Sequence, residues 1–194
     1  SPKVVGNIHI PAPTDQDKMW LNEISQFRNS SLINKIKSRN SQHDHLNMWR
    51  LNHILTQCDM THDLGSYLYF DAAACDNIDK VSLLNHYGLD ITHHYSKCLL
   101  DAFETDNKMA YDRLVTWGAN VGDMMSCFLK DKKERIKFSI FAQTDLSEWQ
   151  MQGQESILRR HYEIDDDSVL LIRTVFNFKS RKIRTMVLID DKYA

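Results

Sequence analysis

The feature that most constrains the fold is an internal repeat in the middle of the chain. Two segments align without gaps, and each ends in an aromatic residue followed by a glycine, so that Gly88 and Gly118 stand thirty positions apart. The same interval before Leu84 leads to Ile54, with Leu55 beside it, which indicates a third, weaker copy. The match between the two clear copies continues through Leu84 and Leu114, Val81 and Tyr111, Ala72 and Ala102, and Tyr69 and Leu99.

The residue types at these positions predict a pair of short helices in each copy. The small side chains of Ala72 and Ala102 would let the first helix of a copy lie close to the second. The glycines would end the second helix in a left-handed backbone conformation, which residues with a Cβ resist. Because one helix pair cannot bury its apolar side alone, we expect the copies to stack around a shared core.

The segments LYFDAAACDNIDKVSLLNHYGLDI and CLLDAFETDNKMAYDRLVTWGANV resemble ankyrin repeats. The family's closing Leu-Leu-x-x-Gly-Ala-Asp-Val is well matched. The family's Thr-Pro-Leu-His opening is absent, and Lys97 to Leu100 stand in its place. The period of thirty residues is also shorter than the usual period of about 33 residues. The alternative is an unrelated helical domain with two helix pairs that are similar by chance.

Divergent, shortened repeats of this kind look like those of large DNA viruses and other intracellular parasites. The resemblance implies a non-catalytic protein–protein interaction module, in this case a virus-encoded factor that engages a host protein. It transfers no catalytic residue. Trp117 precedes a helix-ending glycine, where an aromatic side chain can anchor a partner. With Tyr87, His86 and Tyr111 it forms the predicted partner-binding set, the alternative for such aromatic residues being a role in the core.

The flanking segments complete an α+β fold, with a strand-and-helix part at 1–45, the helical repeats at 46–131 and a strand-helix-hairpin unit at 132–194. In the first part we expect one strand from Lys3 to Ile10 and a helix from the N-cap Thr14 to Arg28. A break at Asn29 to Ser31 would precede a second short helix, and Ser38 to Asp44 would form a loop. In the last part we expect a strand at Arg135–Ala142, a helix at Asp145–Tyr162 and a hairpin of Ser168–Phe176 with Ile183–Ile189.

The C-terminal hairpin carries the features of an alternative function. Lys179, Arg181, Lys182 and Arg184 crowd its turn, where they would contact phosphates, or would simply keep the hairpin soluble and its edge unpaired. Asp190 and Lys192 follow an apolar strand, as in metal-dependent nucleases whose carboxylates hold Mg²⁺. Glu148 and Asp165 to Asp167 would complete such a site. The simpler alternative is a solvated hairpin end, so the sequence leaves an enzyme open but favours none.

Composition limits the remaining classes of function. The net charge of −2 argues against a surface built wholly for nucleic acid. No apolar run approaches the roughly 20 residues that span a bilayer. Four dispersed cysteines without a CxxC pair favour a reducing compartment, so we predict a cytoplasmic or nuclear protein, in the host cell if viral. His43 and His45 lack a second ligand pair, so no metal or cofactor is predicted. Because the chain opens with Ser1, we expect a processed product or part of a longer protein.

Overall fold

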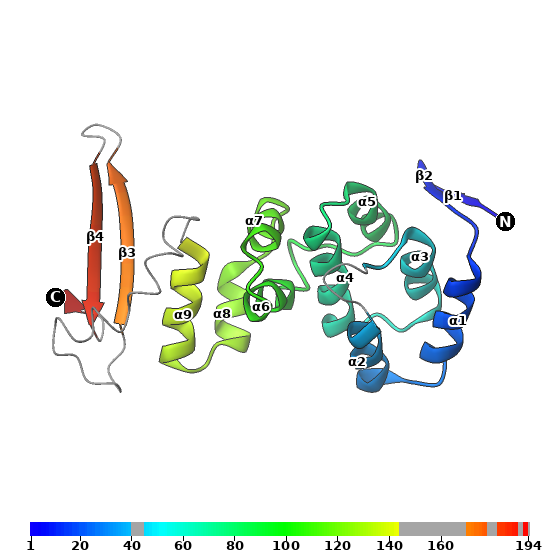
Figure 1. Ribbon diagram of the computed structural model, residues 1–194, viewed down its shortest axis with the longest axis horizontal. Helices are drawn as coiled ribbons and strands as arrows, with labels where there is room; N and C mark the ends of the chain where they lie inside the picture. Colours follow the sequence, from blue (N-terminus) through cyan, green and yellow to red (C-terminus); the bar gives the residue numbers. More distant parts are fainter. Residues whose placement is uncertain (40–44, 144–169, 178–181, 190–191, 194) are drawn as a thin grey trace. The chain divides into compact units, whose positions relative to one another are not determined.

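The computed structural model describes residues 1–39, 45–143, 170–177, 182–189 and 192–193 (Figure 1). Within these ranges the chain is mostly helical and forms two small antiparallel sheets, so the predicted α+β class is confirmed at this level. The chain divides into two compact units, Ser1–Met124 and Met125–Ala194. The first unit therefore joins the N-terminal segment to the helical repeat.

The N-terminal segment begins with a short hairpin rather than the single strand that we predicted. β1 (Lys3–Val5) pairs antiparallel with β2 (Ile8–Ile10), and Val5 lies opposite Ile8 across a two-residue turn. Gly6 in that turn has a φ of +59°, which a residue with a side chain adopts only under strain. β2 contacts both α3 and α5 of the repeat, with Ile8 and Ile10 buried.

The two helices that follow confirm the predicted cap but not the predicted boundaries. Thr14 caps α1 (Asp15–Ile24), because its Oγ1 accepts from Asp17 N at 3.1 Å and Asp17 Oδ2 accepts from Thr14 N at 2.9 Å. The helix ends at Ile24 instead of Arg28. The predicted break at Asn29 is the start of α2 (Asn29–Arg39), where Asn29 has a φ of +55°. The predicted loop falls mostly on residues outside the described ones.

The repeat consists of α3 (Met48–Gln57), α4 (His62–Ala74), α5 (Ile78–His86), α6 (Lys97–Glu104) and α7 (Lys108–Thr116) (Figure 1). α4 packs against α5, α6 and α7, and α6 packs against α7, so the two helix pairs predicted from the sequence lie against each other. Ile54, Leu84 and Leu114, at equivalent positions of the three copies, are all fully buried. Ala72 and Ala102 are also fully buried, as the close approach of the helices requires.

The two later copies form the same backbone hydrogen bonds at equivalent positions. Gly88 and Gly118 have φ values of +87° and +103°, as predicted. After each glycine the next backbone N–H turns back to the helix: Leu89 N donates to Leu84 O at 3.1 Å and Ala119 N to Leu114 O at 2.9 Å. The weaker copy, which is the first in chain order, differs here, because Cys58 at the glycine position has an extended backbone with a φ of −107°.

α8 (Val121–Phe128) spans the boundary between the units, and the second unit continues with α9 (Lys132–Gln143). The predicted strand at Arg135–Ala142 is therefore wrong. Ile136, Phe138 and Ile140 alternate as in a strand, but the buried pair is Phe138 and Phe141, which are spaced as on one side of a helix.

The C-terminal hairpin is confirmed. β3 (Leu170–Asn177) pairs antiparallel with β4 (Lys182–Ile189), and β5 (Lys192–Tyr193) adds to the far edge of β4. Leu170 lies opposite Ile189 and Asn177 opposite Lys182. α9 contacts β3. The predicted helix at Asp145–Tyr162 lies outside the described residues.

Candidate partner-binding surface

α3, α5 and α7 are the equivalent helices of the three copies, and we call them the outer helices. Each begins after an asparagine, and these asparagines occupy equivalent positions of the repeat. In each case Oδ1 accepts a backbone N–H of the first turn: Asn47 from Arg50 N at 2.8 Å, Asn77 from Asp79 N at 3.0 Å and Asn107 from Ala110 N at 3.0 Å. Such caps stabilise a helix start by about 1 kcal/mol. The sequence analysis did not single out these three residues, although their spacing is visible. They fix where α3, α5 and α7 begin.

Just after two of these caps, large apolar side chains project into solvent. Ile78 and Met109 are each 65% exposed in the first turn of α5 and α7, and Val115 further along α7 is 40% exposed. A single exposed apolar residue has little meaning, but a group on successive copies is typical of an interaction site. We refer to Ile78, His86, Met109, Val115 and Trp117 as the outer-helix surface.

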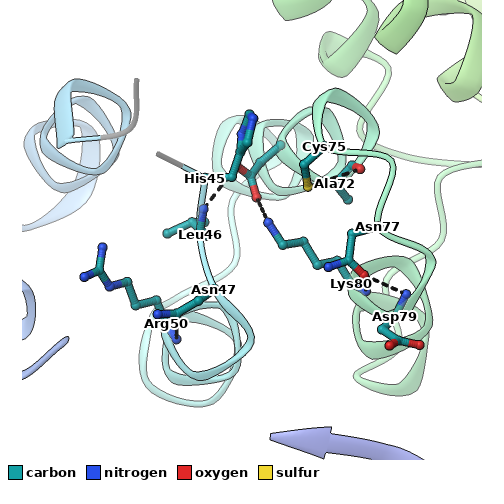
Figure 2. A network of polar contacts seen from close by, with 10 residues as sticks. His45, Leu46, Asn47, Arg50, Ala72, Cys75, Asn77, Asp79 and Lys80 are labelled. Carbon is teal, nitrogen blue, oxygen red and sulfur yellow. Dashed lines mark hydrogen bonds and ion pairs between the residues drawn. The ribbon is translucent and has the colours of Figure 1, made fainter. Parts of the chain in front are cut away.

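A buried ion pair joins α4 to α5 (Figure 2). Asp71 Oδ2 lies 2.8 Å from Lys80 Nζ, and these side chains are only 2% and 3% exposed. Asp71 Oδ1 accepts from Leu46 N at 3.3 Å and lies 3.2 Å from His45 Nδ1. Figure 2 shows Lys80 reaching away from α5 toward the segment of His45 and Leu46. With both carboxylate oxygens occupied, the arrangement is structural and joins α4, α5 and the segment before α3.

The next copy has the same carboxylate without the same cation. Asp101 is the counterpart of Asp71 in the alignment of the copies, whereas the counterpart of Lys80 is Ala110. The Asp101 side chain is 9% exposed, its Oδ1 lies 3.6 Å from Lys37 Nζ, and its buried Oδ2 has no hydrogen-bond partner in the described part of the chain. Burial raises the pKa of Asp101 to about 6, although Lys37 and Lys97 act in the opposite direction.

The predicted partner-binding residues are not equally accessible. His86 is exposed, and its ring meets Tyr87 edge-on with the ring centres 5.4 Å apart. Tyr87 is half-buried, and its hydroxyl donates to Asn52 Oδ1 at 2.7 Å, which joins α5 to α3. Trp117 is half-buried at the C-cap of α7. Tyr111 is only 5% exposed, so its ring belongs to the core of the repeat in this conformation.

The predicted nucleic-acid residues are described only in part. Lys182 and Arg184 lie on β4, while Lys179 and Arg181 fall outside the described residues. Of the nuclease candidates, Lys192 lies on β5, and Asp190, Glu148 and Asp165 to Asp167 fall outside the described residues. The structure thus brings together no carboxylate set of that kind within the ranges it describes.

The histidines that lie close together in sequence, His43, His45, His53 and His62, are not brought together among the described residues. His45 lies beside Asp71, His62 lies 5.9 Å from Tyr95 between ring centres, and His53 stacks on Trp49. His43 falls outside the described residues. Across the residues that can be placed, no group of three or more His, Cys, Asp or Glu is arranged to hold a metal ion. Nor does any helix in the described ranges have the length and apolar character needed to cross a membrane.

Comparison of the chain with protein-family models, with curated proteins and with solved structures gives no match.

Proposed function

We propose that this chain is a non-catalytic protein-recognition module that binds a partner through the outer-helix surface. The observation that carries the proposal is the exposure of Ile78 and Met109 in the first turn of two successive outer helices. The resemblance to ankyrin repeats supports the same function. A virus-encoded factor that engages a host protein is the form of this function that the shortened, divergent repeats suggest.

The scaffold beneath this surface is suited to recognition because its helices are held in fixed positions. Asn77 and Asn107 set the start of α5 and α7, and Arg113 Nη1 of α7 donates to Ala73 O at the end of α4 at 2.7 Å. A surface ordered in advance loses little conformational entropy on binding. Aromatic side chains such as Trp117 are frequent energetic anchors in interfaces.

The experiment compares capture of binding proteins by the chain and by two matched variants. Replacing Ile78 and Met109 together by Asp should abolish capture of specific partners, because burying a carboxylate in an interface core is unfavourable. Met19→Asp is the control, since Met19 on α1 is 63% exposed but lies outside the outer-helix surface. Circular dichroism should show equal helix content in all three proteins. Equal loss of capture in both variants, or loss in neither, would refute the assignment of this surface.

A second candidate function, nucleic-acid binding, is favoured by the register of the C-terminal hairpin. Val175 lies opposite Arg184 and Arg173 opposite Met186, and alternate residues of a strand share one face. Arg173, Lys182 and Arg184 therefore share a face of the β3–β4 sheet. The alternate positions of the two strands have no charged residue type: Leu170, Ile172, Thr174, Phe176, Ile183, Thr185, Val187 and Ile189.

The charge distribution supports this second candidate. Residues 125–194 contain 13 Lys and Arg against 11 Asp and Glu, whereas residues 1–124 contain 11 against 15. Binding to single-stranded RNA should weaken with salt, and the variant with Arg173, Lys182 and Arg184 changed to Gln should bind less tightly and with a shallower salt dependence. Mg²⁺-dependent cleavage that Asp190→Ala abolishes would turn the candidate into a nuclease. Binding that is unchanged in the triple variant would exclude this face.

A further inference from the structure

The first unit contains a hollow of about 330 Å³ that lies apart from the outer-helix surface. Its walls come from α1, the turn to α2, the start of α2, the end of α3 and the start of α4. Small-molecule sites in proteins usually have volumes of roughly 300–1,000 Å³. The apolar part of the wall is formed by Leu21, Ile24, Phe27, Leu32, Ile33 and Leu64.

The hollow lies where the repeat departs from its own pattern. In the two later copies the glycine turn sends Leu89 and Ala119 into the core, where they are 9% and 7% exposed. In the first copy Cys58 continues in an extended conformation, and the following residue, Asp59, is exposed to solvent. Gln57, Cys58 and Asp59 all line the hollow. The first copy thus places a polar residue where the other two place an apolar one that enters the core.

One wall carries a half-buried imidazole ring. The His53 ring lies in the wall, stacked on Trp49 at 5.5 Å between ring centres and edge-on to Trp20 at 6.5 Å. Among the described residues, nothing forms a hydrogen bond with its ring nitrogens. Burial lowers the pKa of His53, so the ring is neutral at pH 7 and offers one N–H donor and one nitrogen acceptor.

The remaining polar residues give the hollow no net charge. Arg28 and Asp59 both line it and are exposed, and their charges have opposite signs. The Cys58 thiol also lines it, and burial raises the pKa of this thiol, so it is protonated and unreactive at pH 7. Because these two charges are of opposite sign, the wall as a whole favours neither an anion nor a cation.

We infer that the hollow is a binding site for a compact, uncharged small molecule with an aromatic or branched apolar body and one group that hydrogen-bonds to His53. Such a ligand fills apolar space and forms a hydrogen bond with the half-buried His53 ring. The site is independent of the outer-helix surface, so either proposal can fail without the other.

Indole and toluene are suitable probes, because indole has an N–H donor for His53 and toluene has none. The whole chain is titrated with each compound and followed by two-dimensional NMR of its backbone amides. Saturable shifts with indole at residues of α1, α2 and α3 are expected. His53→Leu should weaken indole binding about three- to tenfold, as loss of one hydrogen bond implies, and leave toluene binding unchanged.

Two variants that add bulk at different positions of the wall complete the test. Ser25→Trp and Leu32→Trp should each reduce the affinity for indole at least tenfold, while Ser31→Trp, at an exposed position of α2 outside the wall, should leave it unchanged. If Ser25→Trp fails to fold, the affinity of Leu32→Trp for indole still tests the proposal. No saturable shift with indole, or equal binding by the filled variants and the unaltered chain, would overturn the proposal.

Discussion

The same substitution, Asp→Asn, should have opposite effects on stability at two equivalent positions of the repeat. Asp101 is buried with one oxygen unpartnered among the described residues and Lys37 Nζ 3.6 Å from the other, whereas Asp71 is paired with Lys80 at 2.8 Å. At pH 7.5 Asp101→Asn removes a poorly compensated buried charge. At the same pH Asp71→Asn leaves the buried ammonium group of Lys80 without its counter-ion. The first change should stabilise the protein and the second should destabilise it.

The magnitude for Asp101 comes from linkage between proton binding and folding. The pKa of Asp101 is raised from 3.8 to about 6, so the folded state binds the proton more tightly than the unfolded state. The resulting stabilisation is fully present below about pH 4 and is lost as the pH rises through 6, and the difference is about 3 kcal/mol. Because Asn also loses the contact with Lys37, we expect Asp101→Asn to gain about 1–3 kcal/mol at pH 7.5. Asp71→Asn should lose about 3–5 kcal/mol.

Thermal unfolding followed by circular dichroism between pH 4 and pH 7.5 tests both values. One kcal/mol corresponds to roughly 2–4 °C in a chain of this size. Asp101→Asn should therefore raise the melting temperature at pH 7.5 by several degrees, and this advantage should disappear toward pH 4. A lower melting temperature for Asp101→Asn at pH 7.5, or a difference from the unaltered chain that does not change with pH, would refute the reasoning.

Four further substitutions, with one control, test the repeat itself by thermal or urea unfolding. Gly88→Ala should destabilise the protein by about 1–2 kcal/mol, because alanine resists the left-handed backbone at this position. Gly118→Ala should destabilise it by more, because the added Cβ would also lie 2.8 Å from Thr92 Cγ2. Equal effects of the two substitutions would contradict this account. Asn107→Ala should cost about 1 kcal/mol, as the loss of a helix cap does, while Asn34→Ala on the exposed side of α2 should change stability little. Tyr87→Phe should cost about 1 kcal/mol by removing the hydrogen bond to Asn52, and unchanged stability would show that this bond contributes nothing.

The parts of the fold that the sequence predicted are those in which local and tertiary preferences agree. The left-handed glycines, the buried Ala72 and Ala102 and the Thr14 cap each depend on one residue type at one position. The β3–β4 hairpin was also predictable, since two apolar strands flank a polar turn. The hairpin of β1 and β2 was missed although Gly6 and Asn7 form a two-residue turn signal.

α9 was missed because its sequence fits two periods. Ile136, Phe138 and Ile140 alternate as in a strand, but the lysine-rich run before them favours a helix, and its start is marked by Arg135 N donating to Asp131 O at 3.0 Å. Only burial of Phe141 together with Phe138 decides between the two. Short apolar segments remain ambiguous until their tertiary contacts are known.

The candidate sites were less predictable than the fold. An aromatic residue before a glycine, as at Tyr87 and Trp117, identifies a helix end but not its exposure, and both of these are half-buried. Tyr111 was grouped with them although it is buried. An alignment of the two copies by charged residues reveals a signal that the apolar alignment missed. Asp71 aligns with Asp101, but Lys80 aligns with Ala110, so only the first of the two carboxylates has this lysine. The hollow depends on the turn from α1 to α2, which lies outside the repeat.

The N-terminal hairpin packs against two of the outer helices. β2 contacts α3 and α5, and a side chain added at Gly6 would lie 3.3 Å from the His86 ring. The first ten residues are therefore an integral part of the folded body, and a fusion tag that displaces them would disturb α3 and α5. A macromolecule that approaches α3 and α5 therefore meets a surface that the first ten residues of the chain already partly cover.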